Sequence, residues 1–289
     1  MIIVSYNQAK SYLSVMQEIL EENESANSLM LGVLLRLQNE PEQFKHVPFL
    51  RTTHDTQGLL AAAVQTPPKS VLFYHDRPNF YSDSLGIFAV DLFQNNFNPP
   101  GVLAQREVAD AFANIWSSVS GMATELALRE RLYECAEVRY KAEASGDLRE
   151  PKPDELPMII EWAEAMESEF GLPEAGQDTE ARITHFFKTH ALFVWADASR
   201  AVSMVLKTRP TRNTISISGV YTPPSLRNRG FASAAVSTLT RRLLDSGIKK
   251  CVLFTDLGNP TSNAIYQRIG YIPVVDYNFH KFTRQPLTR

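Results

Sequence analysis

An extended run, a short loop and a helical stripe follow one another between residues 214 and 244, and this order limits the folds open to the chain. Residues 214–222 read as a strand. From Gly230 to Leu244 the apolar residues recur at helical spacing. A strand that leads through a short loop into a helix is typical of α/β architecture, in which helices cover the faces of a sheet.

The flanking segments continue this order. A turn at 209–213 joins two extended runs as a hairpin, and Gly247 ends the helix. We therefore expect a mixed sheet with helices on its faces. The predicted elements of the second half are a helix at 153–171, extended runs at 191–196, 201–208 and 214–222, a helix at 230–244, a strand at 251–255, a helix at 260–269 and an extended run at 271–282.

The first half shows a similar but weaker order. The runs Val64-Gln65-Thr66-Pro67-Pro68 and Leu206-Lys207-Thr208-Arg209-Pro210 both fall at predicted hairpin turns. This echo and the matching order favour an internal duplication. The predicted elements are a long helical region at 8–37, extended runs near Phe49 and at 59–65, 70–75 and 85–92, and a helix at 104–119.

The segment 138–157 reads as a domain junction. It holds polar residues, Gly146 and three prolines, Pro151, Pro153 and Pro157. A length of 289 residues fits two domains of roughly 140 each. We predict an N-terminal domain at 1–146 and a C-terminal domain at 147–289.

Composition excludes several classes of protein. A hydrophobic content of 44% with 21% charged residues indicates a soluble globular chain, and the net charge of -3 argues against a broad nucleic-acid surface. Two cysteines make no disulfide framework, and neither Cys nor His spacing indicates zinc. The apolar run at residues 1–4 is too short for a signal peptide, and no membrane span is present. We expect a cytoplasmic protein with no metal, membrane or nucleic-acid partner.

The loop before the helix predicted at 230–244 has the residues of a phosphate-binding site. The first turn of a helix presents unpaired N–H groups and the positive end of its dipole. Gly230 lets the backbone approach an anion closely, Ala232 keeps the next position small, and Arg227 and Arg229 add positive charge. A pyrophosphate is the expected ligand.

This loop and a second motif resemble the GNAT superfamily of acyl-CoA N-acyltransferases. Arg227, Gly230 and Ala232 match the family pattern Q/R-x-x-G-x-G/A. The second match is the Asn-led helix Asn259-Pro260-Thr261-Ser262-Asn263-Ala264-Ile265-Tyr266-Gln267-Arg268-Ile269-Gly270-Tyr271. Asn259, Ser262 and Tyr266 share one face of that helix. The resemblance covers residues 148–282 and implies a C-terminal GNAT domain.

The resemblance assigns roles to these residues. Acetyl-CoA would lie against the strand before the loop, and an N–H near Val220 would act as oxyanion donor, with Gly219 easing a bulge. Tyr266 would stand near the thioester sulfur as general acid. The coenzyme A-binding residues implied are Val220, Tyr221, Thr222, Arg227, Asn228, Arg229, Gly230, Phe231, Ala232, Asn259 and Ser262.

The implied reaction is direct attack of an amine on the thioester, which moves an acetyl group to a small-molecule or peptide amine. The general base is not identified. Glu161 and Glu164 are candidates, against the alternative that both are solvated helix-face residues. Two other hypotheses stay open: a non-catalytic acyl-CoA-binding regulatory module, and a different phosphate-ligand protein that uses the same loop.

The first half lacks the loop motif. Residues 98–105 stand where a duplicated loop is expected, and they have neither the arginine nor the glycine–small spacing. We therefore predict a degenerate GNAT-like domain that has lost coenzyme A binding. We expect it either to wall the acceptor cleft or to form the surface of a homodimer.

Overall fold

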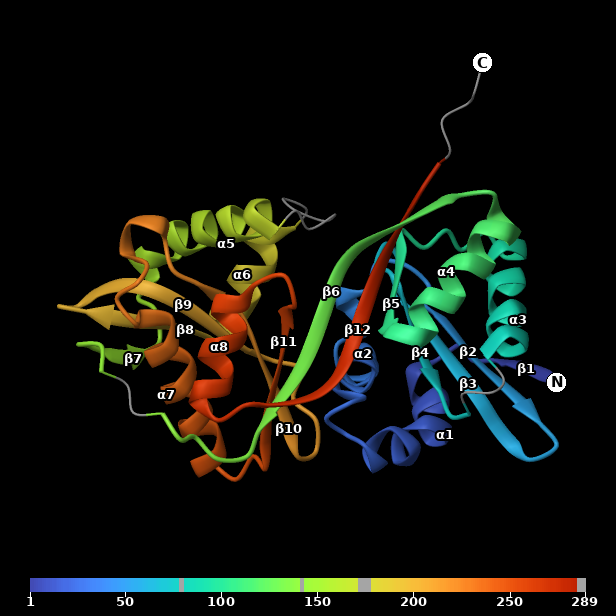
Figure 1. Ribbon diagram of the computed structural model, residues 1–289, viewed down its shortest axis with the longest axis horizontal. Helices are drawn as coiled ribbons and strands as arrows, with labels where there is room; N and C mark the ends of the chain where they lie inside the picture. The colour runs from blue at the N-terminus through green and yellow to red at the C-terminus, as the bar shows by residue number, and fades with distance from the viewer. Residues whose placement is uncertain (78–80, 141–142, 171–177, 285–289) are drawn as a thin grey trace, which may run out of the picture. The chain divides into compact units, whose positions relative to one another are not determined.

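The computed structural model describes residues 1–77, 81–140, 143–170 and 178–284, and Figure 1 shows the ribbon. The chain forms two compact units, each assembled from separate stretches of sequence. The first unit comprises Met1–Leu132, Thr255–Asn259 and Val274–Arg289, and the second comprises Tyr133–Phe254 and Pro260–Pro273. Each unit has its own apolar cores.

The first unit is built on a sheet in which β1, β2, β3 and β4 are antiparallel neighbours and β5 runs parallel to β4. The last strand of the chain, β12, adds antiparallel to β5. The elements are β1 (Ile2–Ser5), α1 (Ala9–Glu22), α2 (Ser28–Asn39), β2 (Phe49–Asp55), β3 (Gly58–Gln65), β4 (Val71–His75), α3 (Tyr81–Gln94), β5 (Gly101–Gln105), α4 (Arg106–Ser120) and β6 (Ala123–Cys135).

The second unit has a sheet in which β7, β8, β9 and β10 are antiparallel neighbours and β11 runs parallel to β10. The elements are β7 (Asp147–Arg149), α5 (Leu156–Phe170), α6 (Thr179–Lys188), β8 (Leu192–Asp197), β9 (Arg200–Thr208), β10 (Thr214–Tyr221), α7 (Phe231–Asp245), β11 (Lys250–Asp256), α8 (Pro260–Ile269) and β12 (Ile272–Thr283).

Both units follow one order of elements. A strand, two helices and three antiparallel strands lead into a helix, a strand parallel to the last one, a second helix and a final strand. The predicted α/β class, with a mixed and mostly antiparallel sheet flanked by helices, is confirmed, and its described strands form one 12-stranded sheet rather than two. The two echoed runs fall at the β3–β4 and β9–β10 turns, which are equivalent positions.

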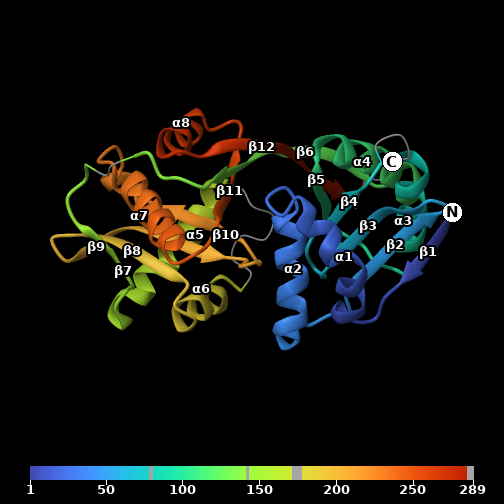
Figure 2. The ribbon, with the colours of Figure 1, turned by 90° about the horizontal axis from the view of Figure 1, so that it is seen from below.

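Each unit buries apolar cores on both faces of its strands. In the second unit, α7 residues such as Ala235 and Leu239 pack in one core, while Ile159 of α5 and Ile183 of α6 pack in the other. Figures 1 and 2 show α7 and α6 on opposite sides of β8 and β9. In the first unit, α3 and α4 cover one face and α1 and α2 the other. The loop between β10 and α7 therefore joins a strand to the helix that covers one face of the sheet.

The strands β6 and β12 carry the chain between the units. Tyr277–Lys281 of β12 pair antiparallel with β5, and Phe282 packs in the core of the first unit. Conversely, Tyr133 and Cys135 at the end of β6 pack in the core of the second unit. The predicted domains 1–146 and 147–289 therefore follow the duplication in sequence. The compact units differ from them, because the first unit includes the end of β12 and the second includes the end of β6.

Three predicted elements of the first half are corrected. The segment 85–92, predicted as extended, is helical, and its buried residues Leu85, Phe88, Ala89 and Leu92 follow helical spacing. The helical region 8–37 is two helices with a break at 23–27, and residues 104–105 close β5 before α4 begins. Among the described strands and α-helices, β1, β6, β7 and α6 had no counterpart in the prediction.

Candidate functional site

The strands β10 and β11 separate at the start of the candidate site. Their parallel pairing consists of three residue pairs, from Thr214↔Lys250 to Ser216↔Val252. Yet β10 continues to Tyr221 and β11 to Asp256, and both strands lie wholly in the described part of the chain. The edge of β10 after Ser216 is therefore open toward β11.

A bulge interrupts the other edge of β10. The antiparallel register with β9 shifts between Ser218 and Tyr221, and Gly219 has a φ of +56°. A Cβ at residue 219 would lie 2.6 Å from Leu206 Cδ1. The register pairs neither Gly219 nor Val220 with β9. The predicted bulge is confirmed, and it leaves backbone groups near Val220 outside the ladder.

The loop after β10 ends at an uncapped helix start. Asn228 and Gly230 both take left-handed backbone conformations, with φ of 64° and 78°. Phe231, which is 4% exposed, fixes the first residue of α7 in the core. The first intrahelical bond runs from Ala234 N to Gly230 O, at 2.9 Å. The N–H groups of residues 231–233 precede that bond, so they are the donors that an anion would meet.

The two loop arginines differ in their surroundings. Arg227 Nη2 donates to both carboxylate oxygens of Glu169, at 2.9 and 2.7 Å, and its Nε donates to Thr222 O at 2.9 Å. Arg229 is exposed, and the structure shows it in no ion pair within the described residues. Both side chains of the Arg227–Glu169 pair are 42% exposed. Such a pair contributes about 0–1 kcal/mol, so a phosphate can displace it.

Glu169 also accepts a hydrogen bond from the last residue of β10. Tyr221 donates its hydroxyl to Glu169 Oε1 at 3.2 Å, and the Arg227 guanidinium lies 5.5 Å from the centre of the Tyr221 ring. Burial and the nearby carboxylate raise the pKa of Tyr221. No sequence pattern had marked Glu169, because only the fold brings the end of α5 to this loop.

The Asn-led helix begins at Pro260 as predicted. Asn259 N donates to Asp256 O at 3.1 Å, and Gly258 N donates to Asp256 Oδ1 at 2.7 Å, which fixes the turn from β11 into α8. Asn259 groups with the first compact unit, whereas Ser262 and Tyr266 group with the second. Their shared ligand-facing side therefore stays a prediction.

Tyr266 is half-buried against the core of the second unit. Its ring meets that of Tyr271 edge to face, with centroids 6.0 Å apart. Burial raises the pKa of Tyr266 to about 12. The hydroxyl therefore stays protonated at neutral pH and can donate a hydrogen bond. Full transfer of its proton to a thiolate, whose conjugate thiol has a pKa of about 8.5, is uphill.

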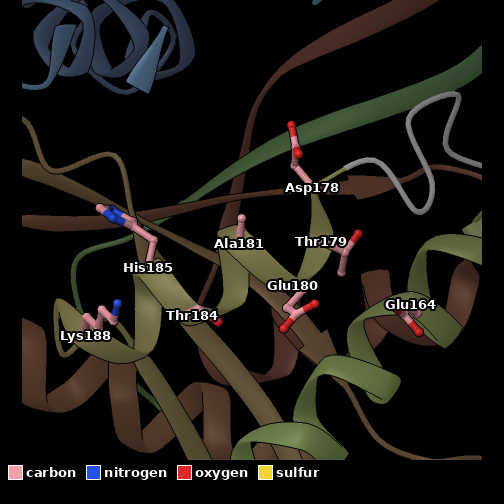
Figure 3. A pocket seen from close by; sticks show the side chains of 8 residues that line it. All are labelled: Glu164, Asp178, Thr179, Glu180, Ala181, Thr184, His185 and Lys188. Atoms are coloured by element: carbon pink, nitrogen blue, oxygen red, sulfur yellow. The ribbon is translucent and has the colours of Figure 1, made fainter. Parts of the chain in front are cut away.

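The two carboxylates considered as bases lie elsewhere. Glu161 and Glu164 are both exposed on α5. Glu164 lines a hollow of about 720 Å³ beside α6, shown in Figure 3. The residues that line it with Glu164 are Asp178, Thr179, Glu180, Ala181, Thr184, His185 and Lys188. None of the predicted coenzyme A-binding residues is among them, so the structure does not join Glu164 to the loop.

The first unit shows how the equivalent loop differs. Its parallel pair, Val71↔Val102 and Leu72↔Leu103, flanks α3 as the β10–β11 pair flanks α7. The equivalent loop is therefore 76–80, and the prediction of 98–105 was wrong because 101–105 is β5. The sequence of this loop, Asp76-Arg77-Pro78-Asn79-Phe80, contains no glycine. Residues 78–80 lie outside the described part of the chain.

The sequence of the second unit matches one family model. Residues 156–271 match the Acetyltransferase (GNAT) family. By this match, residues 156–271 are identified as a GNAT domain. The GNAT domain contains both predicted motifs, from the loop at Arg227 to Tyr266 of α8. No curated protein sequence matches the chain.

Several solved structures are similar to the chain over both units. A GCN5-related N-acetyltransferase from Sphaerobacter thermophilus is 16% identical, with 99% of this chain and 96% of that chain covered and a TM-score of 0.64. A GNAT-family acetyltransferase from Colwellia psychrerythraea is 13% identical, with 99% and 100% covered and a TM-score of 0.57. A tandem GNAT protein from the clavulanic acid biosynthesis pathway is 11% identical, with 99% of both chains covered and a TM-score of 0.55. At these identities the likeness shows the fold alone.

The described residues contain no group of three or more His, Cys, Asp and Glu side chains placed to hold a metal ion. None of their helices has the length and apolar character needed to cross a bilayer.

Proposed function

We propose that the GNAT domain transfers an acetyl group from acetyl-CoA to an amine by direct attack. The observation that carries the proposal is the opening of β10 from β11 after Ser216, next to an uncapped helix start. An extended thioester arm needs free strand edge, and its pyrophosphate needs backbone donors. The second unit offers both within one strand–loop–helix segment.

The proposed contacts follow the segment in order. Backbone groups of Val220, Tyr221 and Thr222 would pair with the pantetheine arm. The loop from Arg227 to Ala232, including Asn228, Arg229 and Phe231, would hold the pyrophosphate. Asn259 and Ser262 would contact the arm from the Asn-led helix. These assignments rest on the sequence match and on the open edge and free N–H groups described above.

The residues of the site would then divide the chemistry. The neutral amine forms the new C–N bond as the C–S bond breaks, and the amine proton ends on the departing sulfur. A backbone N–H beside the bulge at Gly219 would stabilise the oxyanion. Tyr266 would donate a hydrogen bond to the sulfur. Its raised pKa favours this role over complete proton transfer.

We also propose that the first unit binds no coenzyme A. Its equivalent loop has no glycine, and Arg77 is bound there by Asp55, Gln57 and the Leu59 carbonyl. A chain would then hold one acetyl-CoA. This proposal deepens the sequence-based hypothesis of a degenerate repeat.

The test has two stages. Calorimetric titration measures acetyl-CoA binding, and a thiol-release assay against a panel of amines then measures transfer. We expect one acetyl-CoA per chain and thiol release with at least one amine. Tight binding without thiol release from any amine would favour the acyl-CoA-binding regulatory module. Absence of binding would favour a different phosphate ligand.

A further inference from the structure

We propose that Glu169 binds a cationic amine acceptor, and that Arg227 occupies this carboxylate until acetyl-CoA arrives. The inference rests on the proposed function, and it names the class of acceptor and the order in which the site becomes ready. The pyrophosphate would draw Arg227 away from Glu169, and the freed carboxylate would receive a positively charged group of the acceptor, separate from the neutral amine that attacks the thioester.

The starting point is the position of the carboxylate. Glu169 lies in the last turn of α5, and the hydroxyl of Tyr221 donates to it. Tyr221 is the last residue of β10, directly after Val220. Tyr221 packs in the core on the α5 face of the sheet, whereas Val220 packs in the core on the α7 face. The carboxylate therefore lies at the end of the open strand, on the face opposite α7.

Arg227 connects the phosphate loop to this carboxylate. It comes three residues before Gly230, and its guanidinium reaches past the ring of Tyr221 to both oxygens of Glu169. The guanidinium would therefore have two competing acceptors, a carboxylate and a pyrophosphate. A phosphate presents more charge and more acceptor oxygens, and the N–H groups of α7 add to its attraction for this end of the loop.

Loss of Arg227 would leave Glu169 with Tyr221 alone. Within the described residues, Arg227 is the cation that the structure pairs with Glu169. A carboxylate that is partly enclosed and has lost its counter-ion favours a new cation. The acceptor that fits carries a positively charged group in addition to the amine that is acylated. An amine without such a second, charged group would gain nothing from Glu169.

The deciding experiment uses Glu169→Gln in the full chain, with Glu180→Gln as matched control. Glu180 is an exposed glutamate on α6, which packs with α5 in the same core, so both variants lose the same charge from the same face of the sheet. In Glu169→Gln, Arg227 is free for the pyrophosphate, and we expect the Kd for acetyl-CoA to fall about threefold. We expect the KM for a cationic amine to rise about fivefold, with a smaller change in kcat. Glu180→Gln should change neither constant.

A second pair of variants isolates the competition. Glu169→Gln introduced into an Arg227→Gln background should no longer tighten acetyl-CoA binding, because the competing guanidinium is gone. Unchanged thermal unfolding temperatures would show that both variants fold. Weaker acetyl-CoA binding in Glu169→Gln, or an amine KM equal to that of Glu180→Gln, would overturn the inference while leaving the proposed transferase intact. If the wild-type chain releases no thiol with any amine, the transferase proposal fails, and the affinity measurements alone decide the Arg227–Glu169 exchange.

Discussion

The β4–α3 loop of the first unit and the β10–α7 loop of the second occupy the same place in one repeated fold. The second loop combines a positive-φ glycine with N–H groups that precede the first helical bond. The first has no glycine between Asp76 and Tyr81. The same order of elements therefore forms whether or not this loop contains a glycine, because the cores and the sheet pairing do not depend on it.

The two loop arginines sharpen the contrast. Arg77 binds Asp55, Gln57 and the Leu59 carbonyl, and its side chain is 24% exposed. Arg227 is more exposed, at 42%, and shares its carboxylate with a tyrosine. Arg77 binds the β2–β3 turn to the β4–α3 loop. Arg227, in our proposal, exchanges Glu169 for a pyrophosphate.

The largest expected effect concerns the C-terminal strand. A fragment of residues 1–132 lacks Tyr277 and Phe282, which fill the first unit, and Tyr277 also donates to Ala26 O. Losing two buried aromatic side chains costs about 3–5 kcal/mol each, which is comparable to the whole stability of a domain. We expect this fragment not to fold, whereas residues 133–273 fold alone. Circular dichroism during urea unfolding checks both fragments.

The control for that experiment joins residues 274–284 to the 1–132 fragment through a flexible linker. We expect this chain to unfold cooperatively. Cooperative unfolding of 1–132 without the added strand would show that the first unit does not need β12.

The next largest effect concerns Gly230, because the β10–α7 loop has this glycine and the β4–α3 loop has none. Gly230→Val should weaken acetyl-CoA binding about 100-fold or more, because a β-branched residue strains a positive φ and would crowd the phosphate. Gly247→Val is the matched control, since Gly247 also has a positive φ and lies just after α7. Calorimetry with both variants checks this. Equal affinities in the two variants would remove the loop from the site.

A moderate effect is expected at Tyr266. Tyr266→Phe keeps the packing against Tyr271 and removes the hydroxyl. We expect kcat to fall about tenfold to a hundredfold with little change in acetyl-CoA affinity, because the hydrogen bond forms mainly to the departing sulfur. Steady-state kinetics and titration separate the two. Unchanged kcat would leave Tyr266 as a packing residue only.

The smallest effect compares the two arginines directly. Arg227→Gln should weaken acetyl-CoA binding about fivefold, and Arg77→Gln should leave it unchanged. Arg77→Gln should instead lower the thermal unfolding temperature, since it leaves Asp55 without its cation. A loss of acetyl-CoA affinity in Arg77→Gln would mean that the first unit contributes to binding.

Local sequence patterns predicted the second unit well where they carried strong signals. Asn259 and Pro260 placed the start of α8, and the loop glycine placed the start of α7 within one residue. The pattern failed at α3, because a short apolar run such as residues 85–92 suits a strand as well as a buried helix.

The remaining failures come from contacts between distant parts of the chain. Pairing of β12 with β5 depends on residues far apart in sequence, and no local pattern encodes it. The same holds for Glu169, which meets Arg227 only after α5 packs on the sheet. The conformation of the loop at 227–232 could be anticipated because its glycine and the helix start lie within six consecutive residues.

The two loops differ, in our proposal, in that the β10–α7 loop binds coenzyme A and the β4–α3 loop does not. Titration of the wild-type chain with acetyl-CoA decides this, because the number of bound molecules equals the number of loops that bind. We expect one acetyl-CoA per chain and essentially none in Gly230→Val. Two molecules per wild-type chain, or one retained in Gly230→Val, would contradict it.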